Sequence, residues 1–120
     1  MILTVDGLRA HAATGGADLG TGDGPVTLLV HGAGNDASVW QLQTRFLAHH
    51  GVRALAVDLP AHGPSEGDPL ESIEALADWT ASFIDAAGLG AVHVVGHSMG
   101  TFIALELASR YPQLVAGIVL

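Results

Sequence analysis

The sequence predicts an α/β fold with a mostly parallel sheet, an N-terminal β-hairpin and helices on both faces. Two observations carry this prediction: short, continuously apolar runs alternate with segments of helical periodicity, and turn residues separate them. Continuous apolar runs are typical of parallel strands that are buried on both faces. The length of 120 residues suits one domain, so we assign residues 1–120 to a single domain.

The strands follow in order along the chain. ILTV (2–5) and LRAHAAT (8–14) flank Asp6-Gly7, a pair that is typical of a tight hairpin turn. Residues 15–25 are rich in glycine and aspartate, which predicts a loop. Four further apolar runs predict buried strands: VTLLV (26–30), VRALAVDL (52–59), AVHVV (91–95) and LVAGIVL (114–120).

Two helices are predicted between the first three of these runs. The first begins near Ser38 and ends at Gly51, and four apolar residues recur in it at helical spacing. These residues are Val39, Leu42, Phe46 and Leu47. The second helix begins at Asp68, which acts as its cap, with Pro69 at the first helical position, and Gly88 ends it.

The third helix, Met99 to Arg110, opens directly after the strand at 91–95, and GHSMG (96–100) forms the turn between them. Phe102, Leu105 and Ala108 are expected to form part of one face of this helix. A G-x-S-x-G turn strains the backbone of its serine, while the glycines let strand and helix approach each other. Ser98 would therefore present its hydroxyl beside a helix N-terminus, which favours a developing negative charge.

Three glycine-containing segments follow predicted parallel strands: HGAG (31–34), DLPAHG (58–63) and GHSMG (96–100). Ligands bind to such sheets outside the carboxyl ends of the strands. We therefore expect the three segments to converge on one rim and to form a site.

These segments, in register, resemble motifs of the α/β-hydrolase family. HGAG is similar to the family's HG motif, and DLPAHGPS (58–65) to its D-x-P-G-H-G-x-S segment, with Ala61 in place of glycine. GHSMG looks like the family's nucleophile elbow. Trp40 and its helix lie where many members carry W-x-x-Q-x-x-x-L. The resemblance extends from residue 26 to residue 120 and implies a partial α/β-hydrolase fold.

The resemblance implies a role for individual residues. Ser98 would be the nucleophile, and the backbone N–H groups of Ala33 and Met99 would form the oxyanion hole. Five residues would support these motifs: His31, Gly32, Gly96, His97 and Gly100. A serine at this position implies a small-molecule acyl substrate such as an ester or thioester, because the epoxide and haloalkane branches carry aspartate there.

Most of the other histidines have structural interpretations. His31 is expected to hold its loop by hydrogen bonds, and His62 to pack within its own loop, where Ala61 alters the turn slightly. His97 is not expected to be the base, because adjacent side chains in a sharp turn point apart. Four histidines are interpreted as strand or helix residues: His11, His49, His50 and His93. No pair has metal-ligand spacing with carboxylate support, so we predict neither a metal nor another cofactor.

The two partners of a serine nucleophile are missing from the 22 residues that follow Ser98. These residues contain no histidine, and their one carboxylate, Glu106, is expected inside a helix and facing away. In the family the acid and then the histidine follow the serine. We therefore interpret the chain as the N-terminal part of a serine hydrolase, truncated at its C-terminal side. Two alternatives remain: a non-catalytic domain that binds a ligand or partner, and one half of a split enzyme.

Composition excludes several partners. Four arginines, no lysine and a formal charge of −8 argue against nucleic acid and anionic membranes, and charges interrupt every apolar run before it could span a bilayer. The absence of cysteine and of a signal peptide favours the cytoplasm. The last strand would leave an apolar sheet edge, which predicts self-association or pairing with a second chain.

Overall fold

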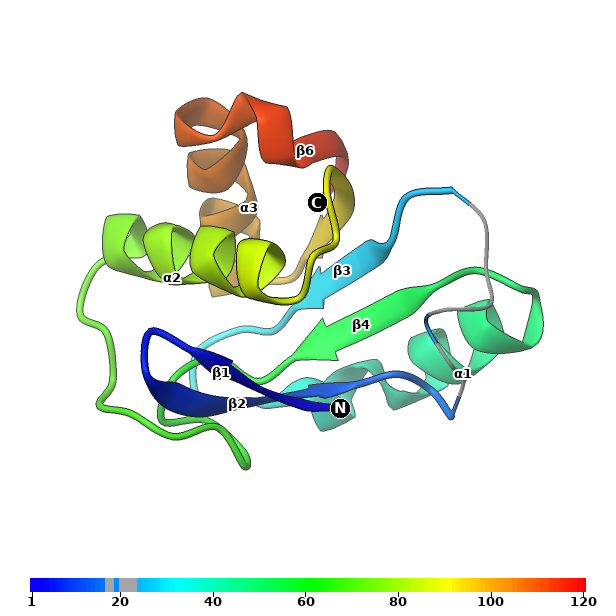
Figure 1. Ribbon diagram of the computed structural model, residues 1–120, viewed down its shortest axis with the longest axis horizontal. Coiled ribbons are helices and arrows are strands. Elements are labelled where there is room, and N and C mark those ends of the chain that lie inside the picture. Colours follow the sequence, from blue (N-terminus) through cyan, green and yellow to red (C-terminus); the bar gives the residue numbers. More distant parts are fainter. Residues whose placement is uncertain (17–18, 20–23) are drawn as a thin grey trace.

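The computed structural model describes residues 1–16, 19 and 24–120. These residues form a sheet that is covered by helices on both faces (Figure 1). Its strands lie in the order β1 (Ile2–Val5), β2 (Leu8–Ala13), β4 (Ala54–Val57), β3 (Thr27–Val30), β5 (Val92–Gly96) and β6 (Val115–Val119). The prediction of an α/β fold with helices on both faces is therefore confirmed. Part of the loop predicted at 15–25 lies outside the described residues.

An antiparallel hairpin and four parallel strands make up the sheet. Asp6 and Gly7 form the hairpin turn and both have positive φ angles, as a tight turn of this kind requires. The hairpin joins the parallel strands through an antiparallel pairing of β2 with β4. The other neighbouring strands, β3 with β4, β3 with β5 and β5 with β6, pair in parallel.

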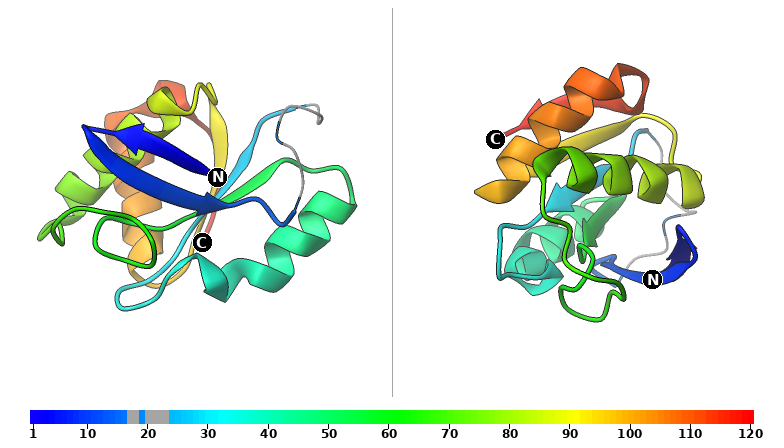
Figure 2. Two further views of the ribbon diagram at one scale, coloured as in Figure 1. Left: turned by 60° about the horizontal axis from the view of Figure 1, so that its bottom comes forward. Right: turned by 90° about the vertical axis from the view of Figure 1, so that its left-hand side faces the viewer.

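Helices α2 (Ile73–Ala86) and α3 (Met99–Arg110) lie together on one face of the sheet, and α1 (Gln41–His49) lies on the other (Figure 2). Two short 3₁₀ helices flank them: η2 (Ala37–Trp40) leads into α1, and η3 (Pro112–Leu114) leads into β6. Each of the three crossovers between parallel strands therefore contains one α-helix, which is the expected way to join such strands.

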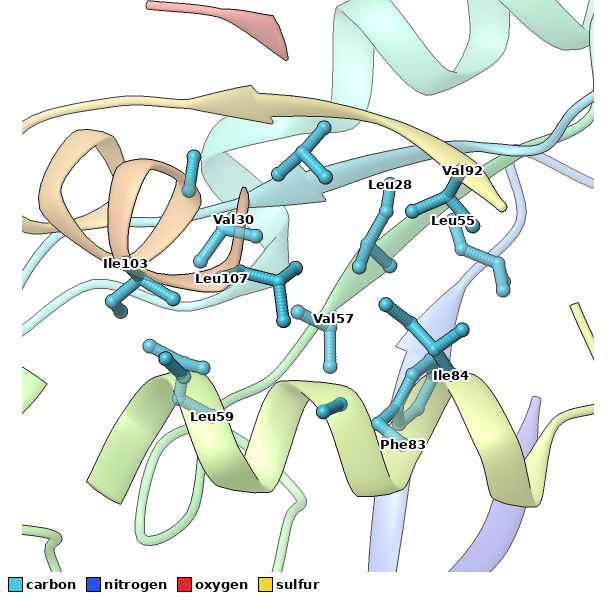
Figure 3. Packing of buried hydrophobic residues seen from close by; sticks show 14 of the residues in the cluster. Leu28, Val30, Leu55, Val57, Leu59, Phe83, Ile84, Val92, Ile103 and Leu107 are labelled. Atoms are coloured by element: carbon cyan, nitrogen blue, oxygen red, sulfur yellow. The ribbon is translucent and has the colours of Figure 1, made fainter. Parts of the chain in front are cut away.

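The main core lies between the sheet and the pair α2 and α3 (Figure 3). Side chains from β3, β4 and β5 meet side chains from both helices, and all of those named next are fully buried. They are Leu28, Leu55, Val94, Phe83, Ile84, Ile103 and Leu107. A second, smaller cluster lies under α1 and consists mainly of alanines with Leu29.

Two details of the helices differ from the sequence-based prediction. Helix α2 begins at Ile73 and not at Asp68, because the side chain of Ser72 accepts a hydrogen bond from the backbone N–H of Ala75 and caps the helix there. Helix α3 buries residues 100, 103, 104 and 107, whereas Phe102 and Leu105 of the predicted face are exposed.

Candidate functional site

The turn that carries Ser98 lies between β5 and α3. Ser98 has φ 57° and ψ −120°, a strained conformation that side chains rarely adopt, and it is exposed. A Cβ on Gly96 would overlap the carbonyl group of Gly100, and one on Gly100 would overlap the carbonyl oxygen of Val30. Both glycines are thus required for the strand and the helix to come this close, and their approach forces the sharp turn at Ser98.

The loop after β3 contacts this turn. A Cβ placed on Gly32 would lie 3.0 Å from the Cβ of Ser98 and 3.4 Å from the side-chain nitrogen of Asn35. Ala33 follows Gly32 in the same loop. Among the described residues, neither Ala33 nor Met99 donates its backbone N–H to another group. Unpaired backbone N–H groups can bind an oxyanion where they lie beside a nucleophilic hydroxyl.

His31 fixes this loop from below. Its Nε2 accepts a hydrogen bond from the backbone N–H of Leu59 (3.1 Å), and its Nδ1 donates to the carbonyl of Gly32 (2.8 Å). The ring is fully buried, and this burial lowers the pKa of His31 below its usual 6.5. The imidazole is therefore held neutral, and its two nitrogens join the loop after β3 to the loop after β4.

The loop after β4 keeps a glycine-like turn despite its alanine. Ala61 has φ 64°, so this alanine adopts the left-handed conformation that glycine adopts more readily. His62 contacts the carbonyl of Pro60 through Nδ1 (2.9 Å) and packs beside the His31 ring at 5.0 Å. His62 thus packs within its loop, as the sequence predicts.

A histidine–carboxylate pair lies at the same end of the sheet and was missed by the sequence-based prediction. Nδ1 of His11 lies 2.5 Å from the buried carboxylate of Asp58, whose other oxygen accepts the backbone N–H of Ala37 at 2.7 Å. Ser65 accepts a hydrogen bond from the backbone N–H of His11 and donates its hydroxyl to the carbonyl of Asp58. Because 47 residues separate His11 from Asp58, no local pattern signals this contact.

This pair does not serve Ser98. His11 is on β2 and Ser98 follows β5, and three strand spacings separate these two strands, roughly 14 Å at about 4.8 Å each. A general base must lie within hydrogen-bond reach of the nucleophile. The cavity of about 570 Å³ beside His11 and Asp58 is lined by residues of β2, η2 and α1, and not by Ser98.

The charged and aromatic neighbours of Ser98 are engaged elsewhere. The ring of His97 packs edge-on against Trp40 with ring centres 6.3 Å apart. Glu106 faces Arg110 of the same helix, with 3.9 Å between the two charged groups. Asp36 caps η2, and hydrogen bonds from the hydroxyl and the backbone N–H of Ser38 lower the pKa of its carboxyl. None of these side chains is placed as the base for Ser98.

Two further features, a cluster of metal ligands and a membrane-spanning helix, are absent from the part of the chain that the structure describes. No group of three or more His, Asp or Glu side chains is arranged to hold a metal ion there. None of the helices within those residues has the length and apolar character needed to cross a bilayer.

Residues 27–120 match the alpha/beta hydrolase family. The chain is 37% identical over 117 residues to the dihydrolipoyllysine-residue acetyltransferase component of the acetoin cleaving system of Cupriavidus necator, covering 97% of this chain and 30% of that protein. It is 32% identical to (E)-2-((N-methylformamido)methylene)succinate hydrolase of Acinetobacter baylyi, covering 78% and 36%.

Solved structures share the fold. A thermophilic esterase from Thermogutta terrifontis superimposes with a TM-score of 0.81 at 29% identity, over 98% of this chain and 43% of the esterase. The chain therefore spans about a third of the length of the two curated relatives and less than half of the esterase. By its family match and its fold, the chain belongs to the α/β hydrolase family.

Proposed function

We propose that this chain carries the nucleophile and the oxyanion hole of a serine hydrolase that acts on an ester, thioester or related acyl substrate. The observation that carries the proposal is the strained, exposed Ser98 at the junction of β5 and α3. Strained conformations of this kind persist only where the surrounding structure enforces them, and they cluster at active sites.

The proposed reaction passes through an acyl-enzyme. The Oγ of Ser98 attacks the acyl carbonyl carbon, a base accepts the hydroxyl proton, and the alcohol or thiol departs with a proton. Water then attacks the acyl carbon and releases the acid, which restores the serine hydroxyl. The N–H groups of Ala33 and Met99 bind the oxyanion in both steps, and each such donor contributes about 3 kcal/mol to transition-state stabilisation.

The acid and the base of this reaction come from polypeptide outside the 120 residues. A histidine oriented by a carboxylate is the usual group that accepts the proton of a serine hydroxyl. The relatives are much longer than the region that this chain matches, so they have room for these groups outside it. The names of these two relatives include a hydrolase and an acetyltransferase component, and acyl chemistry is compatible with both names.

Turnover of p-nitrophenyl acetate tests the proposal. The chain alone should show at most the residual acceleration of about 10³–10⁴ over water that oxyanion binding provides without a triad. Fusion to the longest segment of the Thermogutta terrifontis esterase that this chain does not match should raise turnover by several orders of magnitude. Ser98→Ala should abolish that gain, and Ser109→Ala, an exposed serine on α3, should not.

Two results would contradict the proposal. Turnover by the chain alone at the level of ordinary esterases, lost in Ser98→Ala, would show that these residues need no outside base. Turnover of the fusion that survives Ser98→Ala would exclude Ser98 as the nucleophile.

The lack of a base near Ser98 among the described residues also suits a non-catalytic domain that binds a ligand on the same rim. Such a domain would be stabilised against heat by acyl compounds equally well in the wild type and in Ser98→Ala. Under the hydrolase proposal, the fusion protein hydrolyses these compounds, and Ser98→Ala abolishes this turnover.

A further inference from the structure

The cavity beside His11 and Asp58 has a polar lining of its own and lies away from Ser98. It has a volume of about 570 Å³. Its walls come from β2 and the residues that follow it, from the loop after β3 with η2, from α1 and from the loop after β4. Because Ser98 is not among the lining residues, a ligand in this cavity takes no part in the chemistry of the serine.

One end of the cavity is acidic. Two carboxylate residues lie together there: a Cβ on Gly63 would lie 2.6 Å from Oδ1 of Asp58 and 3.3 Å from the Cβ of Asp36. Asp58 is buried, and its oxygens are engaged by His11 and by a backbone N–H. Asp36 is partly exposed, and hydrogen bonds from Ser38 lower the pKa of its carboxyl. Asp36 is therefore the ionised carboxylate at this end that a ligand can reach.

The opposite end of the cavity is basic. Arg45 of α1 is exposed and lines both this cavity and an adjoining hollow of about 330 Å³. The segment after β2 lies directly against the helix here, because a Cβ on Gly15 would overlap the carbonyl oxygen of Thr44. Arg45 forms no ion pair with any other residue that the structure describes. Its guanidinium can therefore bind an anionic group of a ligand.

His11 supplies a third polar group to the cavity. Its side chain is 28% exposed, and its Nδ1 lies 2.5 Å from the carboxylate of Asp58. A carboxylate only accepts hydrogen bonds, so Nδ1 carries the proton in this contact. Nε2 is then the ring nitrogen that remains for a ligand, and in the neutral ring it accepts a hydrogen bond from an N–H group.

The distance between the two charged ends limits the length of the ligand. Residues 36–45 run along η2 and then α1, so the backbones of Asp36 and Arg45 are at most about 15 Å apart. Side chains of a helix lean toward its N-terminus, which brings the guanidinium of Arg45 closer to Asp36. An extended dipeptide with a hydrogen bond at each end spans roughly 12 Å, which suits this distance.

We propose that this cavity binds a short zwitterionic peptide of about two residues, with its ammonium group at Asp36, its carboxylate at Arg45 and its peptide N–H at Nε2 of His11. Opposite charges at the two ends favour a zwitterion over a simple ion. A simple anion is repelled by Asp36 and by the formal charge of −8, and a simple cation is repelled by Arg45.

Binding of the dipeptide alanylalanine tests this inference, and it is measured in the chain carrying Ser98→Ala so that the result is independent of the proposed hydrolase chemistry. Calorimetric titration should show one-to-one binding. Acetylation of the amino end or amidation of the carboxyl end should each weaken binding by about fivefold or more, because one charge-assisted hydrogen bond is lost. In NMR spectra of the histidine rings, His11 should shift, while the exposed His93 of β5 should not. Absence of binding, or equal affinity for the three peptides, would overturn the proposal.

Matched variants assign the two ends of the peptide. Asp36→Asn removes the charge but keeps a side chain that can cap η2, and it should bind alanylalanine and the acetylated peptide equally well. Arg45→Gln changes an exposed residue and should bind alanylalanine and the amidated peptide equally well. Arg9→Gln changes an exposed arginine of the hairpin outside the cavity and should keep both preferences. If either cavity variant keeps the preference that it should lose, or if Arg9→Gln loses one, the proposal is wrong.

Discussion

The core beneath α2 and α3 and the rim of loops above the sheet are built in different ways. In the core, fully buried aliphatic and aromatic side chains from strands and helices pack in ordinary conformations. On the rim, Ala61 and Ser98 have positive φ angles, and one buried imidazole joins two loops. Stability therefore comes mainly from the core, while the rim retains local strain and depends on single polar atoms.

The largest expected change in stability distinguishes a buried phenylalanine from an exposed one. Phe83 of α2 is fully buried, whereas Phe46 of α1 is 63% exposed. Phe83→Ala should lower the free energy of unfolding by about 3–5 kcal/mol, because a cavity replaces the ring. Phe46→Ala should change it by less than about 0.5 kcal/mol. Urea unfolding followed by circular dichroism measures both, and equal losses would show that Phe46 is buried in solution, for example by self-association.

A smaller loss of stability is expected when the side chain of His31, which joins two loops of the rim, is replaced. His31→Gln should cost about 1–3 kcal/mol at pH 8, because the N–H of Leu59 loses a well-placed acceptor. Burial lowers the pKa of His31, so below pH 6.5 the unfolded chain binds a proton that the folded chain excludes. The contribution of His31 to stability is thus complete above pH 6.5 and is lost as the pH falls toward the folded-state pKa.

Unfolding free energies measured from pH 8 to pH 5 test the direction of this pH dependence. The decrease in stability below pH 6.5 should be smaller in His31→Gln than in the wild type. His49→Gln, which changes an exposed residue near the end of α1, provides the control and should retain the wild-type decrease. An unchanged pH dependence in His31→Gln would show that the burial of this ring does not govern its protonation.

The same contrast explains what could be predicted from the sequence. The strands were found because each is a continuous apolar run between turn residues, and the turn at Ser98 because its two glycines are visible in the sequence. The sequence-based prediction grouped Phe102 and Leu105 on one face of α3 but did not identify the buried face. That face follows from Gly100: once Gly100 contacts Val30, positions 103, 104 and 107 must also face the sheet. The large apolar side chains of Phe102 and Leu105 lie on the other side of the helix and are exposed.

Contacts between distant segments were not predictable in this way. The pairing of His11 with Asp58 depends on β2 lying beside β4, which no local pattern records. The start of α2 was misplaced because Asp68 and Ser72 are both good caps, and the choice between them depends on packing. Sequence patterns thus predict elements and single turns, whereas the polar links between loops follow only from the folded topology.

The smallest expected effect is a gain in stability on the rim. Ala61 has φ 64°, a conformation that costs an alanine about 1 kcal/mol and a glycine almost nothing. Ala61→Gly should therefore raise the free energy of unfolding by about 0.5–1 kcal/mol, even though glycine loses more entropy on folding. Ala116→Gly in β6, where φ is not positive, should lower it. A loss of stability in Ala61→Gly would show that the turn is relaxed with alanine, and Ser98 would then be the one strained position of the rim among the non-glycine residues that the structure describes.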